Sequence, residues 1–214
     1  MTFSLIARCS STGALGVATT SGSIAVGARC PYALANIAAV TTQNRTDPTL
    51  GPALLEALRG GKHPDAALTE VTASAAFAEW RQLAAVDSLG RIGTFHGARC
   101  SGVHGEARGD AAVAIGNLLA APDVPKAMMS AFEAAEGAIE ARLITALEAG
   151  LSAGGEINPL RSAALKVVTD DPFPRSDLRI DNATEPLSML RTLWQSWAPE
   201  AAKCRAWALD PDSV

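Results

Sequence analysis

The sequence predicts an α+β protein built as a four-layer αββα sandwich, in which helices cover two mainly antiparallel sheets. Strand and helix patterns occur in groups, in the order strands, helix pair, strands, helix pair, strands, helix. An alternating parallel-sheet fold would not group them in this way. The first strands are also almost continuously apolar although short turns join them, so both faces of their sheet should be covered. We expect one domain over residues 1–214, with a C-terminal helical segment at about 186–214.

A predicted β-hairpin opens the chain. Residues 2–8 and 15–22 are rich in small, apolar and β-compatible residues, and the turn-forming residues 10–13 separate them. Most chains begin with a frayed tail and not with a core strand. A strand at this point would hold Thr2 at a fixed place in the fold.

The remaining elements follow from hydrophobic periodicity and from breaking residues. Gly60 and Gly61 end one helix, Pro64 marks the first turn of the next, and Gly154 and Gly155 end a later one. Predicted helices cover residues 50–58, 64–75, 124–135, 138–150 and 186 to about 197. Predicted strands cover residues 23–28, 35–42, 81–86, 91–96, 111–115, 162–169 and 177–180, the last of them at a sheet edge.

The composition argues against several classes of partner. The net charge of −4 provides no basic surface for nucleic acid or for an anionic membrane, so we expect neither. No charged-then-apolar leader precedes Thr2 and no apolar run is long enough to span a bilayer, which favours a cytoplasmic protein. The four cysteines are widely spaced, as expected of reduced thiols. We expect no cofactor.

Thr2 is the candidate nucleophile. Methionine aminopeptidases remove Met1 when the next side chain is small, and threonine qualifies. An N-terminal threonine carries a hydroxyl and an amine whose pKa lies near ~7.7–8.0, so nucleophile and base share one residue. The alternative is that Thr2 is an ordinary strand residue behind a retained Met1.

Several short motifs add a family resemblance. They are MTFSLIAR at 1–8, LGVA at 15–18, AVG at 25–27, Thr42-Gln43, Gly51-Pro52, Val86-Asp87 with Gly90-Arg91, GNLLA at 116–120, RSAAL at 161–165 and DLRID at 177–181. In order and spacing they resemble a bacterial family named domain of unknown function 1028, whose fold resembles the N-terminal nucleophile hydrolases. The resemblance implies the αββα fold more strongly than any activity. Ile115 stands where the family pattern has glutamine, and Asn182-Ala183 is less polar than the pair that follows Asp181 in the family pattern. If these positions bind a ligand in the family, the ligand of this protein is expected to differ or to be absent.

The leading functional hypothesis is hydrolysis of a small amide or peptide-like bond at Thr2. The hydroxyl would attack a carbonyl, and a donor from the loop after the fourth strand would hold the oxyanion. Gln43 and Asn44 are the candidates for that donor. A cation near the nucleophile would favour an unprotonated amine, and Arg29 is placed for this role, with an ordinary surface arginine as the alternative.

Two further residues are candidates for ligand contacts. Asn117 follows Gly116 at a strand end, where its amide either faces a cleft between the sheets or caps its own turn. Asp181 either meets a substrate amine or a metal, or it caps the turn before the helix at Pro186.

Histidine and cysteine chemistry is not favoured. His96, Cys100 and His104 are spaced four apart, but the glycines among them argue against a helix, and no carboxylates near them support a zinc site, so we predict no metal. Cys30 or Cys100 paired with a histidine is a possible thiol nucleophile. A free cysteine acting as a small hydrophobe is the simpler interpretation for all four.

Two other functions compete with the hydrolase. One is a binding or sensing module for a small molecule, which keeps the cleft but does not expose the nucleophile; a retained Met1 would favour it. The other is a structural subunit of an oligomer. Trp194 and Trp197 share a face of the last helix, and Trp207 lies beyond its predicted end, which favours a homodimer.

Overall fold

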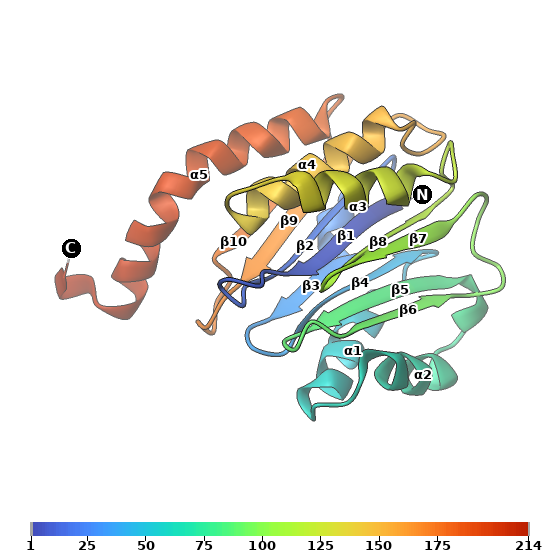
Figure 1. The fold of residues 1–214 in the computed structure, drawn as a ribbon, viewed down its shortest axis with the longest axis horizontal. Helices are drawn as coiled ribbons and strands as arrows, with labels where there is room; N and C mark the ends of the chain where they lie inside the picture. Colours follow the sequence, from blue (N-terminus) through green and yellow to red (C-terminus); the bar gives the residue numbers. More distant parts are fainter. Residues whose placement is uncertain (1, 214) are drawn as a thin grey trace.

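Two antiparallel sheets stack face to face in the computed structural model, which describes residues 2–213 (Figure 1). One sheet has six strands in the order β10-β9-β2-β1-β8-β7, and the other has four in the order β3-β4-β5-β6. The strands are β1 (Thr2–Arg8), β2 (Leu15–Ser21), β3 (Pro31–Leu34), β4 (Ala38–Asn44), β5 (Arg81–Asp87), β6 (Ile92–His96), β7 (Gly105–Gly109), β8 (Ala112–Asn117), β9 (Ser162–Val168) and β10 (Ser176–Ile180).

Helices cover the outer face of each sheet. Figure 1 shows α3 (Val124–Ala134) and α4 (Ile139–Ser152) over the six-stranded sheet, and α1 (Leu50–Arg59) and α2 (Pro64–Ser74) over the four-stranded sheet. The last helix, α5 (Pro186–Leu209), packs against α4, β9 and β10. The predicted α+β class and the two antiparallel sheets are confirmed. No helix within residues 2–213 combines the length and the apolar composition needed to cross a bilayer.

Strand β1 is buried on both faces because it lies inside the larger sheet and inside the stack of layers. Phe3, Leu5 and Ala7 pack with residues of α3 and α4, whereas Ile6 packs with residues of the second sheet. Side chains of a strand alternate between its two faces, so both sets must be apolar. This explains why the opening strand lacks the polar alternation of a half-exposed sheet.

The predicted strand at residues 23–28 is wrong. Ala25 adopts a left-handed conformation with φ of 55°, and Val26–Ala28 forms a 3₁₀ turn. The backbone amides of this segment bond outside any strand ladder: Ala25 N donates to the Asp181 carbonyl, and Val26 N to Ser162 Oγ. The apolar run therefore packs as a loop.

Other boundaries differ from the predictions. The predicted strand at 35–42 begins only at Ala38, as β4, because residues 35–37 form a turn at the left-handed Asn36, and β3 was not predicted. Strand β7 was not predicted, because at the sheet edge its residues are not continuously buried. Helix α5 continues through Pro199, twelve residues beyond the predicted end at Trp197. Proline costs one backbone hydrogen bond there, and this stretch of the helix is largely exposed, so water can satisfy the freed carbonyl.

The C-terminal tryptophans have different environments. Trp194 and Trp197 pack against the larger core, whereas Trp207 is 50% exposed and lies under the Lys203 ammonium. Dimerisation through the exposed end of α5 stays a prediction.

Gly93 tests how closely helix and sheet approach. A Cβ at Gly93 in β6 would lie 2.6 Å from the Pro64 carbonyl carbon and 2.8 Å from Asp65 N at the start of α2. Because backbone atoms cannot rotate away, Gly93→Ala should lower the free energy of unfolding by about 1–3 kcal/mol in urea denaturation. Gly105→Ala in β7 is the matched control, since a Cβ there meets nothing within 4 Å. Equal stability of the two variants would contradict the close approach.

Candidate functional site

The layer between the two sheets changes from apolar to polar along its length. Its apolar part contains Ile6, Val17, Ala39, Val86 and Val113. The same strands continue into a buried polar part that contains Ser4, Thr19, Gln43, Gln82 and Asn117. Polar groups are rarely buried unless they are hydrogen-bonded or serve a function, so this polar end is the candidate site.

Gln82 in β5 is the centre of the polar end. Its Oε1 accepts hydrogen bonds from Gln43 Nε2 at 2.7 Å and from Asn117 Nδ2 at 2.9 Å. Its Nε2 donates to the Gly116 carbonyl at 2.9 Å. A carbonyl can only accept, so this last bond fixes which way the Gln82 amide points. One side chain thus connects the four-stranded sheet to β8 of the larger sheet.

The polar end reaches the surface through His96. Gln82 Nε2 lies 3.0 Å from His96 Nδ1, and since the amide nitrogen must donate, Nδ1 accepts. His96 Nε2 then carries the proton and donates to Glu106 Oε2 at 2.9 Å. This hydrogen bond, with further ones from Thr94 and Arg108, outweighs partial burial and lowers the pKa of Glu106 to about 2.

Thr2 lies at the edge of this network. It is the first residue of β1 and pairs with Asn117 of β8. The residue is 3% exposed, and its hydroxyl donates to Ser21 Oγ at 3.4 Å. The Thr2 carbonyl accepts from Gln43 Nε2 at 3.3 Å. The sequence prediction that the strand would hold Thr2 in place agrees with this geometry.

Gln43 is fully engaged. Its two amide hydrogens go to the Thr2 carbonyl and to Gln82, and its Oε1 accepts from Ser4 Oγ at 2.6 Å. Asn117 uses fewer of its hydrogen-bonding groups. One hydrogen of its Nδ2 is donated to Gln82 Oε1, and its buried Oδ1 has no partner within residues 2–213. An unpaired buried acceptor costs stability and marks a place for a water or a ligand donor.

A carboxylate that the sequence analysis missed approaches the same end. Glu156 is buried, and its Oε1 accepts from Gly22 N at 2.7 Å, next to Ser21. Burial raises the pKa of Glu156 to about 7, although the Gly22 hydrogen bond lowers it. Its Oε2 has no hydrogen-bond partner in the described part of the chain. No local sequence pattern predicts this hydrogen bond, since it joins residues that are 134 apart in the sequence.

The other predicted site residues make their contacts elsewhere. Arg29 Nη1 donates to the carbonyls of Ile24 at 2.7 Å and Ala25 at 3.0 Å, within its own loop. Asn44 Nδ2 donates to the Trp80 carbonyl at 2.6 Å. The Asp181 carboxylate is exposed and pairs with Arg179. The structure therefore brings together Thr2, Gln43 and Asn117 of the predicted set.

Histidine and cysteine side chains do not assemble a metal site. Within residues 2–213, no group of three or more His, Cys, Asp or Glu side chains is placed to hold an ion. The rings of His96 and His104 stack at 5.9 Å. Burial raises the pKa of Cys30 and of Cys100 to about 11, which leaves both as poor nucleophiles at neutral pH. All four cysteines are free.

Sequence comparison identifies the family. A model described as "Family of unknown function (DUF1028)" matches residues 2–190. The chain belongs to this family. No curated protein matches it. The expected family membership is thus confirmed, while the family description assigns no reaction.

Two solved structures are similar in shape. One is the crystal structure of protein SPO2555 from Silicibacter pomeroyi, a DUF1028 protein, with 35% identity, a TM-score of 0.86, and coverage of 91% of this chain and 85% of that chain. The other is Anbu (ancestral beta-subunit) from Yersinia bercovieri, with 9% identity, a TM-score of 0.44, and coverage of 91% of this chain and 93% of that chain. The first shows that the fold is that of the DUF1028 family.

Gln82→Leu tests the polar network. The substitution keeps the approximate volume but leaves the amides of Gln43 and Asn117 and the Gly116 carbonyl without their shared partner. We expect the free energy of unfolding to fall by about 2–4 kcal/mol in urea denaturation. Gln195→Leu, on the exposed side of α5, is the control and should change it by less than about 0.5 kcal/mol. A neutral Gln82→Leu would show that the network contributes nothing to stability.

Glu156→Gln tests the raised pKa. The pKa of glutamate is near ~4.3 in the unfolded chain and about 7 for Glu156 in the fold. Below about pH 4.3 the carboxyl group is protonated in both states and does not change the free energy of unfolding. As the pH rises from there to about 7, the folded state resists ionisation and the free energy of unfolding falls. Glutamine removes this cost and can still accept from Gly22 N. At pH 8 the free energy of unfolding of the variant, measured by urea denaturation, should therefore exceed that of the wild type by up to about 3 kcal/mol. At pH 4 the two values should be equal. A difference independent of pH would refute the shift.

Proposed function

We propose that this protein is an N-terminal nucleophile hydrolase that cleaves a small amide or peptide-like bond. Thr2 is its nucleophile once Met1, which lies outside the described residues, has been removed. The observation that carries the proposal is the place of Thr2: it starts a central core strand, next to Ser21, at the polar end of the layer between the sheets. A hydroxyl held rigidly among buried polar groups suits a nucleophile.

The reaction needs a base for the Thr2 hydroxyl. In the first step the hydroxyl oxygen bonds to the substrate carbonyl carbon while its proton moves to the free α-amine. The amine then gives this proton to the leaving nitrogen as the C–N bond breaks, and water hydrolyses the resulting ester. Glu156, which accepts from Gly22 N beside Ser21, is a second candidate base, because its pKa of about 7 suits proton transfer at neutral pH.

Asn117 is a better candidate than Gln43 for the oxyanion donor. Gln43 has no amide hydrogen left for a substrate, whereas Asn117 has one. Asn117 also pairs directly with Thr2 across the strands, so a carbonyl attacked by Thr2 lies within reach of its amide. Gln43 instead positions the Thr2 backbone through the Thr2 carbonyl. Arg29, bonded within its own loop, is expected to hold that loop.

A second function is favoured by the burial of Thr2. With 3% of its surface exposed, the Thr2 residue is shielded from a substrate unless the surrounding segments move. If Met1 is retained, the same polar end serves a small-molecule binding or sensing module, in which the free acceptor Asn117 Oδ1 receives a ligand donor.

The intact mass of the untagged protein separates the two functions. We expect a mass without methionine, and we expect a β-lactone probe to acylate the Thr2 hydroxyl, measured on the tryptic peptide of residues 2–8. Acylation should become faster as the pH rises to about 8, because the amine must be unprotonated to act as base. Thr2→Ser should keep the reaction and Thr2→Ala should abolish it.

One control isolates the amine. Lysine inserted between Met1 and Thr2 prevents removal of methionine and ties the Thr2 amine into a peptide bond, yet keeps the hydroxyl. This variant should not be acylated. A wild-type mass that includes Met1 would overturn the hydrolase proposal, and so would acylation that persists on the peptide of Thr2→Ala.

A further inference from the structure

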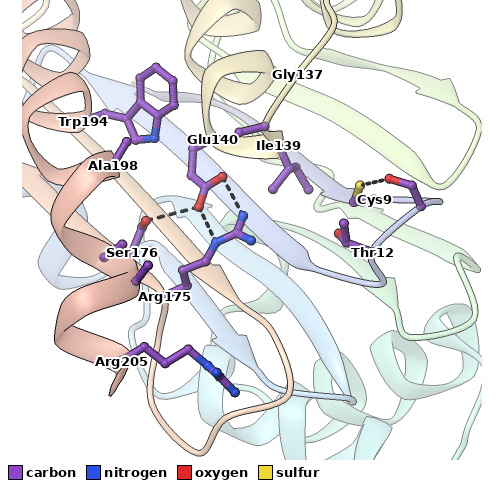
Figure 2. A pocket seen from close by; sticks show the side chains of 14 residues that line it. Cys9, Thr12, Gly137, Ile139, Glu140, Arg175, Ser176, Trp194, Ala198 and Arg205 are labelled. Atoms are coloured by element: carbon purple, nitrogen blue, oxygen red, sulfur yellow. Dashed lines mark hydrogen bonds and ion pairs between the residues drawn. The ribbon is translucent and has the colours of Figure 1, made fainter. Parts of the chain in front are cut away.

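A hollow of about 480 Å³ lies at the opposite end of β1 from Thr2 (Figure 2). Its walls come from the turn after β1, the start of α4, the start of β10 and the middle of α5. Cys9 at this end is seven residues from Thr2, which along a strand is about 20 Å. We call it the α5 hollow. Its volume is in the range of small-molecule sites, and its features do not depend on the chemistry at Thr2.

One wall of the α5 hollow is apolar. Figure 2 shows Trp194 and Ala198 of α5 on one side and Ile139 of α4 beyond the Glu140–Arg175 pair. Ala201 and Ala202 of α5 line it as well. Small side chains beside an indole leave a broad apolar surface that can cover an aromatic or alkyl group.

The charged side chains that line the α5 hollow leave only donors unused. Arg175 uses Nε and Nη2 on Glu140, at 2.8 and 2.7 Å, and Arg205 uses the same atoms on Asp171, at 2.6 and 3.0 Å. In the described part of the chain these bonds leave both Nη1 groups unused, and the indole of Trp194 lines the same hollow. The one carboxylate that lines the hollow, Glu140, has both oxygens bound by Arg175. A ligand with acceptor atoms can therefore use the free Nη1 groups.

The start of α4 adds to this preference. Residues 137–140 line the α5 hollow, and the N-cap residue Ala138 provides no side-chain hydrogen bond to the first amides of this 14-residue helix. Amides at a helix N-terminus carry partial positive charge and favour an anion; here Glu140, paired with Arg175, already places one carboxylate in the first turn, so the helix start adds only a secondary preference. Two guanidinium edges, an indole N–H and a helix start thus lie beside one apolar wall.

We propose that the α5 hollow binds a small apolar monocarboxylate, with its carboxylate on Arg205 and Arg175 and its apolar body against Trp194 and Ala198. Charge-assisted hydrogen bonds to guanidinium groups select the acid over a neutral or cationic analogue. The site is separate from the hydrolase function and stands whether or not Thr2 is catalytic.

Cys9 provides a reporter of occupancy, because it lines the α5 hollow and is 8% exposed. Burial raises the pKa of its thiol, but hydrogen bonds from the side chains and backbone of Ser11 and Thr12 together outweigh burial and lower the pKa to about 7. Cys9 should therefore react with iodoacetamide at neutral pH far faster than Cys30 or Cys100.

The test uses the full chain and 4-phenylbutyrate as the probe. We expect saturable quenching of tryptophan fluorescence. At about four times its Kd, the probe should slow alkylation of Cys9, measured on the tryptic peptide of residues 9–29, about fivefold by mass action. The neutral 4-phenylbutanol and the cationic 4-phenylbutylamine should bind at least about tenfold more weakly. Arg205→Gln should weaken the acid about tenfold and leave the alcohol unchanged.

Two alanines of α5 provide a matched pair of variants. Ala198→Phe fills the α5 hollow from an exposed position and should abolish binding without unfolding the protein. Ala206→Phe lies outside the hollow on the same helix and should bind as the wild type does. Equal binding by Ala198→Phe, equal affinity for the acid and the amine, or no saturable binding at millimolar concentration would each overturn the proposal.

Discussion

The hydrogen bonds of the Gln82 amide hold the two sheets in a defined relation. Apolar contacts, such as those in the cluster that contains Ile6 and Val86, favour burial but have no preferred direction, so they alone would let one sheet slide over the other. The Gln82 amide bonds to Gly116 and Asn117 of the opposite sheet with fixed donors and acceptors. Buried, directional bonds of this kind select one arrangement, and the contact of Gln43 in the smaller sheet with the Thr2 carbonyl in the larger one depends on it.

Local sequence patterns predicted the elements whose partners are local. The helix at 50–58 corresponds to α1, and the strand at 81–86 to β5, because periodicity and breaking residues mark them directly. The strand at 23–28 failed, because an apolar run packed as a loop looks like a buried strand. The candidate site was predicted in part: Thr2, Gln43 and Asn117 converge. Gln82 and Glu156 were missed. Gln82 is a polar residue inside an apolar strand and Glu156 follows a glycine pair, and neither local pattern predicts a partner that is distant in the sequence.

The two ends of β1 have different chemistry for one structural reason. In the middle of the strand both faces are closed by other layers, so only apolar side chains fit there. Toward both ends of the strand the apolar contacts give way to polar groups: amides, hydroxyls and Glu156 at the first end, and Cys9 with two arginine pairs at the second. A rigid central strand thus supports two separate sites, each held in place by the shared core.

The central place of β1 also has a consequence for synthesis of the chain. β1 can pair with β2 early, but its other neighbour, β8, ends at Asn117. At about 5–20 residues per second, β8 follows β1 from the ribosome only after on the order of ten seconds. Throughout that interval one edge of β1 has no partner strand, and the start of the chain is open to processing enzymes. Any trimming of the N-terminus therefore has a limited time window. It ends when β8 pairs with the free edge of β1 and Thr2 becomes buried.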